Sequence, residues 1–474
     1  MMITKTMNTI EVAPDDVFVR VAKPASESPT FKQPTTLRER ISSIDVLRGF
    51  ALLGILMMNI DDFGTPEAAH DVPIGMPKPA FVGPHAHLNL VILILKWVFF
   101  KGKMRAIFSM LFGAGVVLMT TRAEKRGAGG QIADIYLRRN MWLMLLGLLH
   151  GCVLWTGDIL FLYALTALLV LYPLRKLKAK TLLLTGSFIS LVLGTCVLLM
   201  QYLPVVDHIS LHRKAALVAA DRQAGRAITP EQQKIEAQWT QLVNEHKVTE
   251  AGIQEELASA HAGYWKGVED RLQFYIGPRS ALRYLITLIE FTGAMMIGMG
   301  LFKTGFLTAE SSYSTYAWTA SIGFLLSAPL YIFGVLKAYA SGFFFLDIEK
   351  WLFVPYYLTR ESGALAIAAM VMIAVKSGVL RSLQRALAAV GQTALTNYLL
   401  TTALCQFIFI WGPWKLYGKL EYYQLEYVVF LVWAVNLIVS PIWLRIFQFG
   451  PVEWLWRSLT YMKLQPMLKQ RSAK

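Results

Sequence analysis

The chain has 474 residues, of which 55% are hydrophobic and 16% are charged. Soluble globular proteins carry about 25% charged residues, and a mean hydropathy of +0.46 implies more apolar surface than a soluble core of this length can bury. A soluble enzyme or binding domain is therefore excluded. The net charge of +15 does not indicate nucleic-acid binding, because Lys and Arg stand in short clusters between apolar runs, where they set membrane topology.

The first segment of the chain is polar and holds four scattered prolines, so we expect a disordered cytoplasmic tail over 1–43. Apolar runs that are long enough to span a bilayer follow it and recur to the C-terminal end. They predict an all-α polytopic membrane protein with about ten transmembrane helices. The runs are 44–60, 104–121, 139–156, 158–174, 181–202, 282–302, 314–337, 352–375, 386–411 and 425–446.

The charged loops predict how these helices are oriented. With the N-terminus inside, Lys and Arg concentrate in the inner loops, whereas the short outer loops are acidic or mixed, as at Asp61 and Asp62. Both termini are therefore expected on the cytoplasmic side. The apolar segment 87–100 is too short to span the bilayer. Counting it as a span would move the basic loops that follow it to the outer side. We expect it to be a re-entrant or interfacial helix on the outer side.

One large insert separates the apolar runs. Within it, Thr229 before Pro230 and Thr249 before Glu250 are typical of helix N-termini, so we expect a small helical extracytoplasmic lobe. The predicted domains are the tail over 1–43, an N-terminal transmembrane bundle over 44–202, the insert over 203–281, a C-terminal transmembrane bundle over 282–447 and a cytoplasmic tail over 448–474.

Two polar residues mark the first apolar run. Arg48 and Asn59 are eleven positions apart, which places them on one face of a helix, about 16 Å from each other. An arginine inside a span is costly unless it snorkels, pairs or binds a ligand. Arg48 and Asn59 are therefore candidate substrate-binding residues. An interfacial anchor that pairs with Asp45 is the alternative interpretation of Arg48.

Polar residues at the start of two later runs are also candidates for substrate binding. Lys103, Arg105 and Ser109 could hold an anionic group such as a phosphate or a carboxylate; anchoring to lipid headgroups is the alternative. Asn397 and Tyr398 offer hydrogen-bonding groups at the start of the ninth run. Interhelical hydrogen bonding is the alternative there.

A histidine and an aspartate stand on either side of the loop between the third and fourth runs. His150 lies near the outer end of one run, and Asp158 begins the next. A neutral imidazole can take a proton from an attacking hydroxyl or amine, or can itself carry an acyl group, and a nearby carboxylate would orient it. His150 and Asp158 are thus the candidate catalytic residues. The alternatives are a packing histidine and a helix N-cap.

The remaining histidines and the cysteines predict neither a metal site nor a disulfide framework. The pattern His85-x-His87 lacks a third ligand at a characteristic spacing. The three cysteines are odd in number, far apart and inside apolar runs, which is typical of buried thiols.

Taken together, these segments resemble the YeiB-like family of bacterial membrane proteins. The N-terminal pattern of that family is matched by IDVLRGFALLGILMMNI (44–60), GKMRAIFSMLFGAG (102–115) and LLHGCVLWTGDILFLYAL (148–165). Its C-terminal domain of unknown function is similar to GQTALTNYLL (391–400) and FGPVEWLWRSLTY (449–461). The resemblance implies a multi-pass protein of the bacterial cytoplasmic (inner) membrane.

The family is placed in a broader transmembrane acyltransferase superfamily that includes heparan-α-glucosaminide N-acetyltransferase. The resemblance therefore implies acyl-CoA, such as acetyl-CoA, as donor, no metal, and a glycan, lipid or small-molecule acceptor on the outer side. Membrane lipids are expected partners and nucleic acid is not; a homodimer is a further candidate assembly. In the related type-3 acyltransferases a catalytic histidine occupies the position of Asn59, so His150 is the first choice for a replacement. A transporter of a small amphiphile or lipid, and a non-catalytic lipid- or quinone-binding protein, remain alternatives.

Overall fold

The computed structural model of the chain describes residues 42–76, 81–127, 131–277 and 280–469. Within these ranges the chain forms helices and loops, and the single β-type pairing is an isolated bridge between Phe447 and Leu468. The predicted all-α fold class is confirmed. The predicted tail lies outside the described residues as far as residue 41, and so does the last part of the C-terminal tail.

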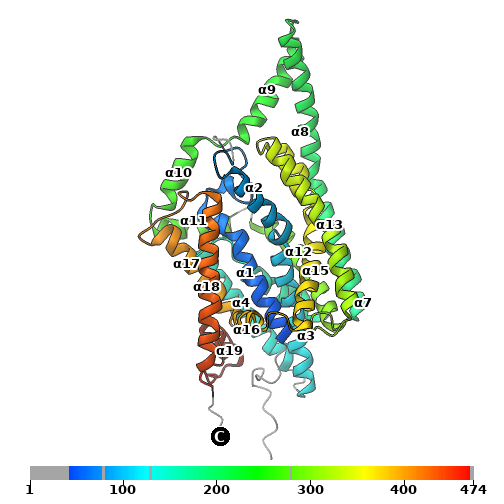
Figure 1. Cartoon of the computed structure of the whole chain (residues 1–474), viewed down its shortest axis with the longest axis vertical. Coiled ribbons are helices and arrows are strands. Elements are labelled where there is room, and N and C mark those ends of the chain that lie inside the picture. Colours follow the sequence, from blue (N-terminus) through cyan, green and yellow to red (C-terminus); the bar gives the residue numbers. More distant parts are fainter. Residues whose placement is uncertain (1–41, 77–80, 128–130, 278–279, 470–474) are drawn as a thin grey trace, which may run out of the picture.

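Most of the long helices run side by side along the long axis of the molecule (Figure 1). The helices are α1 (Ser42–Gly64), η2 (Glu67–Ala69), α2 (Ala86–Leu95), η3 (Lys96–Phe100), α3 (Lys103–Lys125), α4 (Gln131–Val153), α5 (Leu160–Thr166), η4 (Ala167–Leu171), α6 (Tyr172–Leu174), α7 (Ala179–Phe188), η5 (Ile189–Leu193), α8 (Gly194–Gln223), α9 (Pro230–Glu245), α10 (Glu250–Ala260), α11 (Tyr264–Ile276), α12 (Ser280–Lys303), α13 (Tyr313–Ala340), α14 (Phe345–Ile348), η6 (Glu349–Phe353), α15 (Tyr356–Ser377), α16 (Arg381–Gln392), α17 (Ala394–Gln406), η7 (Phe407–Trp411), α18 (Tyr422–Ile446) and α19 (Pro451–Tyr461).

In the part of the chain that the structure describes, eight helical stretches are long and apolar enough to cross a membrane, as judged by length and composition. They are Ser42–Gly64, Ala86–Lys125, Ala179–Cys196, Tyr284–Lys303, Tyr313–Ala340, Tyr356–Ser377, Ala394–Trp411 and Tyr422–Ile446. Each of the ten predicted runs falls on helix, but α4 and the shorter apolar stretch Leu160–Leu174 are not among the eight. In α4 the residues Arg138, Arg139 and Asn140 lower the hydropathy. A multi-pass membrane fold is therefore established, and the number ten stays a prediction.

Two predicted boundaries are wrong. The run 386–411 is not one helix, because α16 ends at Gln392 and α17 begins at Ala394, on either side of a break at Thr393 with φ −110° and ψ 34°. The first half of α16 is exposed and carries Arg381 and Arg385, whereas its second half, from Leu387 to Gly391, is buried. The first run also ends later than expected: α1 continues to Gly64, so Asp61 lies inside the helix and is fully buried rather than exposed in an outer loop.

The segment 87–100 forms a helix of its own. It consists of α2 and η3, and a two-residue turn at Lys101 and Gly102 separates it from α3. Gly102 adopts a φ of +71°, a left-handed conformation that favours glycine. The re-entrant or interfacial position of this helix stays a prediction.

The large insert is helical, as its N-cap signals predict. The side chain of Thr229 caps α9 and forms a reciprocal capping box with Gln232, and the side chain of Thr249 caps α10. Both helix starts are confirmed. The proposed domain boundary at residue 203 falls inside α8, which continues without interruption into the insert. The extracytoplasmic location of the insert stays a prediction.

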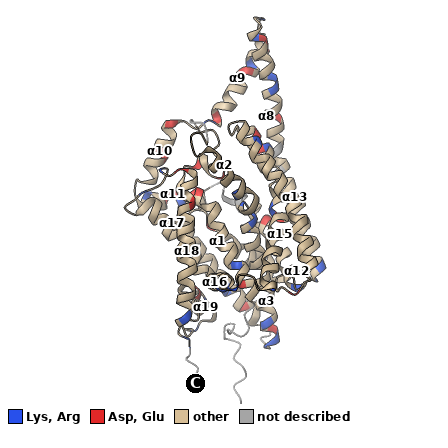
Figure 2. Ribbon diagram, in the orientation of Figure 1, with Lys and Arg blue, Asp and Glu red and all other residues tan. Residues whose placement is uncertain are grey.

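The bundle is held together by closely crossing helices. Figure 2 shows Lys, Arg, Asp and Glu mainly towards the two ends of the molecule and along α8 and α9. The pair α1 and α16 is among the most extensive contacts. A Cβ atom on Gly391 would lie 1.9 Å from the backbone oxygen of Asp45, and one on Gly49 would lie 2.0 Å from that of Leu387. These two glycines therefore let the helices approach at backbone distance, which positions Arg48 beside α16.

Candidate functional site

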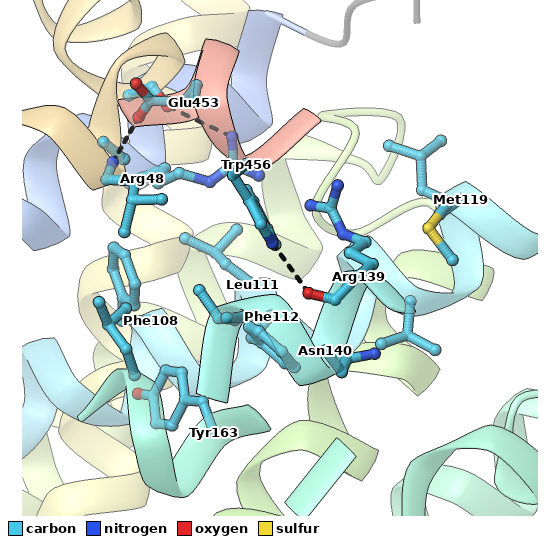
Figure 3. A pocket seen from close by; sticks show the side chains of 18 of the residues that line it. Arg48, Phe108, Leu111, Phe112, Met119, Arg139, Asn140, Tyr163, Glu453 and Trp456 are labelled. Carbon is cyan, nitrogen blue, oxygen red and sulfur yellow. Dashed lines mark hydrogen bonds between the residues drawn. The ribbon is translucent and has the colours of Figure 1, made fainter. Parts of the chain in front are cut away.

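A cavity of about 270 Å³ lies between α1, α3, α4, α5, α16, α17 and α19 (Figure 3). Its walls combine aromatic and aliphatic side chains with a set of arginines. Lining residues used below are Asp45, Arg48, Phe108, Leu111, Phe112, Arg122, Arg139, Leu160, Tyr398, Glu453, Trp456 and Arg457. The lining of the cavity thus comes from both the N-terminal and the C-terminal part of the chain.

The charges that line the cavity are predominantly positive. Among the described residues, four arginines line it together with two carboxylates, and they are Arg48, Arg122, Arg139, Arg457, Asp45 and Glu453. Arg48 donates from Nη1 to Oδ1 of Asp45 at 3.0 Å, which confirms the predicted pairing, and it lies 3.4 Å from the backbone oxygen of Gly391. The excess of guanidinium groups suits an anionic ligand, above all one with phosphates.

Helix α19 closes the cavity and is tied to two other helices. Glu453 accepts hydrogen bonds from the backbone N–H groups of Leu395 at 2.6 Å and Thr396 at 3.0 Å, which caps the N-terminus of α17. Trp456 donates from its indole N–H to the backbone oxygen of Arg139 at 2.8 Å, as Figure 3 shows, and the Arg139 guanidinium lies 3.7 Å from the Trp456 ring centre. The position of Arg139 in the cavity wall is therefore fixed by stacking.

The cavity also has an apolar lining. Phe108, Leu111 and Phe112 of α3 contribute to it, together with Leu160 of α5 and Tyr398 of α17. An anionic group at the arginines and an apolar chain along α3 would fit this distribution of side chains.

His150 and Asp158 meet next to Tyr398, one of the residues that line the cavity. Nδ1 of His150 lies 2.7 Å from Oδ2 of Asp158, and both side chains are almost fully buried. The other carboxylate oxygen, Oδ1, accepts a hydrogen bond from the backbone N–H of Phe161 at 2.8 Å. Asp158 therefore caps the helix and also binds the histidine. From the sequence these two roles were alternatives, and the same residue fills both.

A glycine on α4 allows this contact. A Cβ atom on Gly147 would lie 2.2 Å from the backbone nitrogen of Phe161 and 2.8 Å from Oδ1 of Asp158. With any larger residue the two helices would have to separate, so Gly147 brings α4 and the start of α5 close enough for His150 to reach Asp158.

Tyr398 separates the His150–Asp158 pair from the cavity. Its ring centre lies 5.0 Å from that of His150. Its hydroxyl oxygen lies 3.4 Å from the backbone nitrogen of Ile159 and 3.4 Å from the backbone oxygen of Gly157. Both distances are longer than strong hydrogen bonds, so polar contacts hold the Tyr398 side chain only weakly.

Tyr398 also lines a second and much smaller cavity of about 10 Å³. Asn59, Thr401, Thr402 and Trp155 share it. Thr402 connects it to the histidine, because Nε2 of His150 lies 3.0 Å from Oγ1 of Thr402. Asn59, a predicted binding residue, therefore lies in the same small cavity as a neighbour of His150, although it does not line the larger one.

The three residues predicted to hold an anion lie elsewhere. Lys103 donates to the backbone oxygen of Trp97 at 2.9 Å, Arg105 donates to Glu290 at 2.7 Å, and Ser109 shares a hydrogen bond with Tyr163 at 2.7 Å. None of the three lines the larger cavity. Their substrate-binding role stays a prediction that depends on a ligand replacing these contacts.

Asn397 is used in helix packing. Its amide nitrogen lies 2.8 Å from Oγ of Ser440, 3.0 Å from Oγ1 of Thr393 and 3.2 Å from the backbone oxygen of Val390. These contacts join α17 to α16 and α18, which corresponds to the alternative interpretation as interhelical hydrogen bonding.

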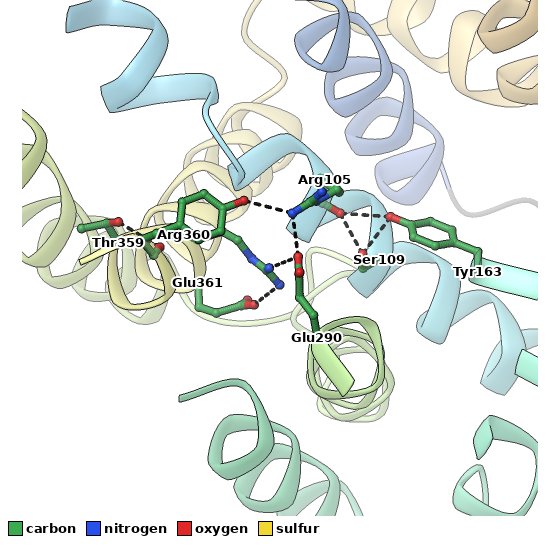
Figure 4. A network of polar contacts seen from close by, with 8 residues as sticks. Arg105, Ser109, Tyr163, Glu290, Thr359, Arg360 and Glu361 are labelled. Atoms are coloured by element: carbon green, nitrogen blue, oxygen red, sulfur yellow. Dashed lines mark hydrogen bonds and ion pairs between the residues drawn. The ribbon is translucent and has the colours of Figure 1, made fainter. Parts of the chain in front are cut away.

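Two buried charge clusters were not predicted. In the first, the guanidinium groups of Arg105 and Arg360 converge on Glu290, and Arg360 also donates to Glu361 at 2.7 Å (Figure 4). In the second, Nζ of Lys96 lies 2.6 Å from Oδ1 of Asp61 and 3.3 Å from Oε1 of Glu426. The signal in the sequence was a single ionisable residue inside an apolar run, as at Lys96 and Glu290.

The comparison with known proteins covers nearly the whole chain. Residues 301–463 match the family described as "Protein of unknown function (DUF418)". The chain is 28% identical to the uncharacterized protein YxaH of Bacillus subtilis (strain 168), over 92% of this chain and 98% of that protein. It is 29% identical to the uncharacterized protein YeiB of Escherichia coli (strain K12), over 92% of this chain and 100% of that protein.

A further relative, described as an uncharacterized 39.9 kDa protein in the amylase 3′ region of Bacillus acidopullulyticus, is 26% identical over 93% of this chain and 99% of its own length. No solved structure matches the chain. The DUF418 match contains α16, α17 and α19, whereas Arg48, His150 and Asp158 come from the N-terminal part. The chain is therefore similar to the YeiB and YxaH proteins over almost its full length, and its residues 301–463 match the DUF418 family.

Proposed function

We propose that this protein is an integral-membrane acyltransferase that moves an acyl group from acyl-CoA to an extracytoplasmic acceptor. The observation that carries the proposal is the position of Tyr398. Its side chain lines an arginine-containing cavity and also packs on His150, which is held by Asp158. A binding site for an anionic donor thus ends one side chain away from a buried base.

The shape and charge of the cavity support acyl-CoA as the donor. Its volume of about 270 Å³ lies just below the range of ligand pockets, which is about 300–1,000 Å³. It therefore suits the acyl group and the pantetheine arm, with the nucleotide outside the arginine-lined end. Arg48, Arg122 and Arg139 would hold the donor phosphates.

The chemistry assigned to His150 follows from its hydrogen bonds. An ionised Asp158 can only accept, so Nδ1 of His150 carries the proton and Nε2 has the free electron pair. Nε2 can take the proton of the attacking hydroxyl or amine as the new bond to the acyl carbon forms. The C–S bond of the thioester then breaks, and the departing thiolate receives that proton to give free CoA.

The proposed orientation places the protein in the cytoplasmic membrane of a bacterium, with the arginine-lined end of the cavity facing inwards. The ends of α3 and α19 that supply Arg122 and Arg457 lie at the lower end of the molecule in Figure 1, opposite α9 and α10. Basic inner loops and bacterial relatives support this orientation. The acceptor would be a glycan, a lipid or a small molecule.

The same cavity supports a second candidate function, the transport of an anionic amphiphile. The specific observation is that the arginines and the apolar wall of α3 would hold such a molecule whether or not His150 reacts. Transport predicts movement of a lipid or amphiphile across the membrane without any release of CoA.

The test uses purified, detergent-solubilised protein and radiolabelled acetyl-CoA. We expect the wild type to bind the label and, with water as a slow acceptor, to release CoA and acetate, and we expect CoA release to be lost in His150→Ala. The control is His87→Ala, which changes an exposed histidine and should behave as the wild type does. Folded wild-type protein that neither binds acetyl-CoA nor releases CoA would overturn the acyltransferase proposal and favour transport, which flux assays in proteoliposomes would then measure.

A further inference from the structure

A hydroxyl group completes a line of hydrogen bonds that starts at Asp158. Oδ2 of Asp158 lies 2.7 Å from Nδ1 of His150, and Nε2 of the same ring lies 3.0 Å from Oγ1 of Thr402. Thr402 is 1% exposed and belongs to α17, 252 positions after His150. Acid, base and hydroxyl therefore stand in the order found in hydrolases and acyltransferases with a serine or threonine nucleophile.

The direction of the hydrogen bonds agrees with that order. With Asp158 ionised and His150 neutral, Nδ1 donates to the carboxylate and Nε2 accepts, so the Thr402 hydroxyl is the donor that faces it. Among the described residues, one other acceptor lies near this hydroxyl, the backbone oxygen of Tyr398, at the longer distance of 3.3 Å. The hydroxyl proton of Thr402 is thus placed for transfer to His150.

We propose that Thr402 is the nucleophile of the reaction and carries the acyl group as an ester between the two half-reactions. This inference rests on the proposed acyltransferase function and adds to it the residue that carries the acyl group. Oγ1 of Thr402 attacks the thioester carbonyl while its proton passes to Nε2 of His150. The C–S bond breaks, the thiolate takes that proton and leaves as CoA, and acyl-Thr402 remains.

The second half-reaction reverses these roles. The acceptor hydroxyl or amine attacks the acyl-Thr402 carbonyl, and Nε2 of His150 takes its proton. The bond between the acyl carbon and Oγ1 then breaks, and the proton returns to Oγ1. Asp158 stays ionised throughout and stabilises the imidazolium in both half-reactions.

The surroundings of Thr402 provide a group that can stabilise the developing oxyanion. Asn59 lines the same small cavity as Thr402. No hydrogen bond joins the Asn59 side chain to any of the described residues, which leaves its amide N–H groups available as donors. A donor of this kind acts on the charge that develops in the transition state.

The path of the acyl group to Thr402 runs past Tyr398. The cavity beside Thr402, about 10 Å³, is too small for an acyl group, but Tyr398 lines both this cavity and the large one. Since the Tyr398 hydroxyl makes only contacts of 3.4 Å, rotation of its side chain would connect the two cavities. Tyr398 is then a positioning residue that separates the donor from the base until the donor is bound.

The test is to incubate the full-length protein with acetyl-CoA in the absence of acceptor, to quench it, and to locate the acetyl group by mass spectrometry. We expect one acetyl group on the peptide that contains Thr402, stable in acid and removed by alkaline hydroxylamine, as for an oxygen ester. Thr402→Val should lose the adduct and reduce turnover by about 10³-fold or more. Thr402→Ser keeps a hydroxyl and should retain both.

The matched control is Thr185→Val, because Thr185 also lies in a helix and donates to a backbone oxygen but is exposed and lines neither cavity. It should keep the adduct and turn over within a few-fold of the wild type. Thermal unfolding in detergent shows whether each variant is folded. If Thr402→Val does not fold, Thr402→Ser decides the outcome.

Acetyl on His150, turnover without any label on Thr402, or wild-type turnover by Thr402→Val would overturn the assignment of Thr402 and leave the acyltransferase proposal in place. The acyltransferase proposal itself fails by a different result, which is folded wild-type protein without binding or turnover of acetyl-CoA.

Discussion

The carboxylate of Asp158 holds the imidazole of His150 with one oxygen, at 2.7 Å, and caps helix α5 with the other, at 2.8 Å from the backbone nitrogen of Phe161. The two functions of the carboxylate are therefore separable by substitution. An asparagine keeps an oxygen for the cap, but its amide group cannot serve as an ionised acceptor for Nδ1.

Asp158→Asn is expected to lower acyl transfer by about 10²–10⁴-fold, because the amide reverses the tautomer and places a proton on Nε2 of His150. Stability should fall by only about 1 kcal/mol, since the cap remains. The measurement is CoA release together with thermal unfolding in detergent. Asp134→Asn, an exposed aspartate on α4, is the control, and equal activity of the two variants would contradict this role of Asp158.

Arg139 and Arg138 provide a matched pair for testing donor binding. Arg139 lines the cavity and stacks on Trp456 at 3.7 Å, whereas its neighbour Arg138 donates to the backbone oxygen of Asp134. Arg139→Ala should weaken CoA binding by about tenfold, or about 1.4 kcal/mol, through loss of a phosphate contact. Arg138→Ala should leave affinity unchanged. The measurement is titration of each variant with CoA at low and high salt. Identical CoA affinities of the two variants would show that the phosphates bind elsewhere.

The cluster of Lys96, Asp61 and Glu426 predicts a strong effect on stability. Lys96→Met would leave two carboxylates buried without their cation, and breaking a buried ion pair in this way costs about 3–5 kcal/mol. Asp61→Asn in the same chain should restore part of that loss, because it removes one of the unpaired charges. The measurement is unfolding in detergent, with Lys337→Met on the exposed side of α13 as control.

If Lys96→Met unfolds at the same temperature as wild type, the three groups do not form an ion cluster in the folded protein. If the double variant is less stable than the single one, the carboxylate of Asp61 contributes by a contact other than that with Lys96.

The crossing of α1 and α16 predicts a steric effect. A methyl group on Gly391 would lie 1.9 Å from the backbone oxygen of Asp45, which cannot move without displacing the helix. Gly391→Ala should therefore reduce stability by about 1–3 kcal/mol and shift Arg48 relative to the cavity. Gly115→Ala is the control, since nothing lies within 4 Å of its Cβ position. It should be neutral or slightly stabilising, and a similar loss in both variants would contradict the close crossing.

Features that depend on short stretches of chain could be predicted from the sequence. Apolar runs that are long enough to span a bilayer indicated the membrane class and fell on helices. The helix starts at Thr229 and Thr249 were predicted correctly because a cap depends on residues within one turn. His150 and Asp158 also belong here, because eight residues and a tight loop between two helices bring them together.

Hydropathy alone was misleading where one part of a helix is exposed and another part is buried. The run 386–411 was predicted as one span because its average composition is apolar, but the exposed arginines of α16 and the break at Thr393 divide it. Asp61 was placed in an outer loop because a carboxylate at the end of an apolar run usually faces water. In the folded chain it is buried against Lys96, 35 positions away.

The sequence by itself determined that this is a helical membrane protein with a histidine and an aspartate in neighbouring helices. Only the tertiary structure decided which side chains meet them. Thr402 reaches His150 across 252 positions, and Arg48 meets Gly391 across 343. The physical reason is that local sequence sets helix formation through propensity, capping and hydropathy. The contacts between helices depend instead on how closely the backbones can cross, and residues distant in the sequence, such as Gly49 and Gly391, determine that together.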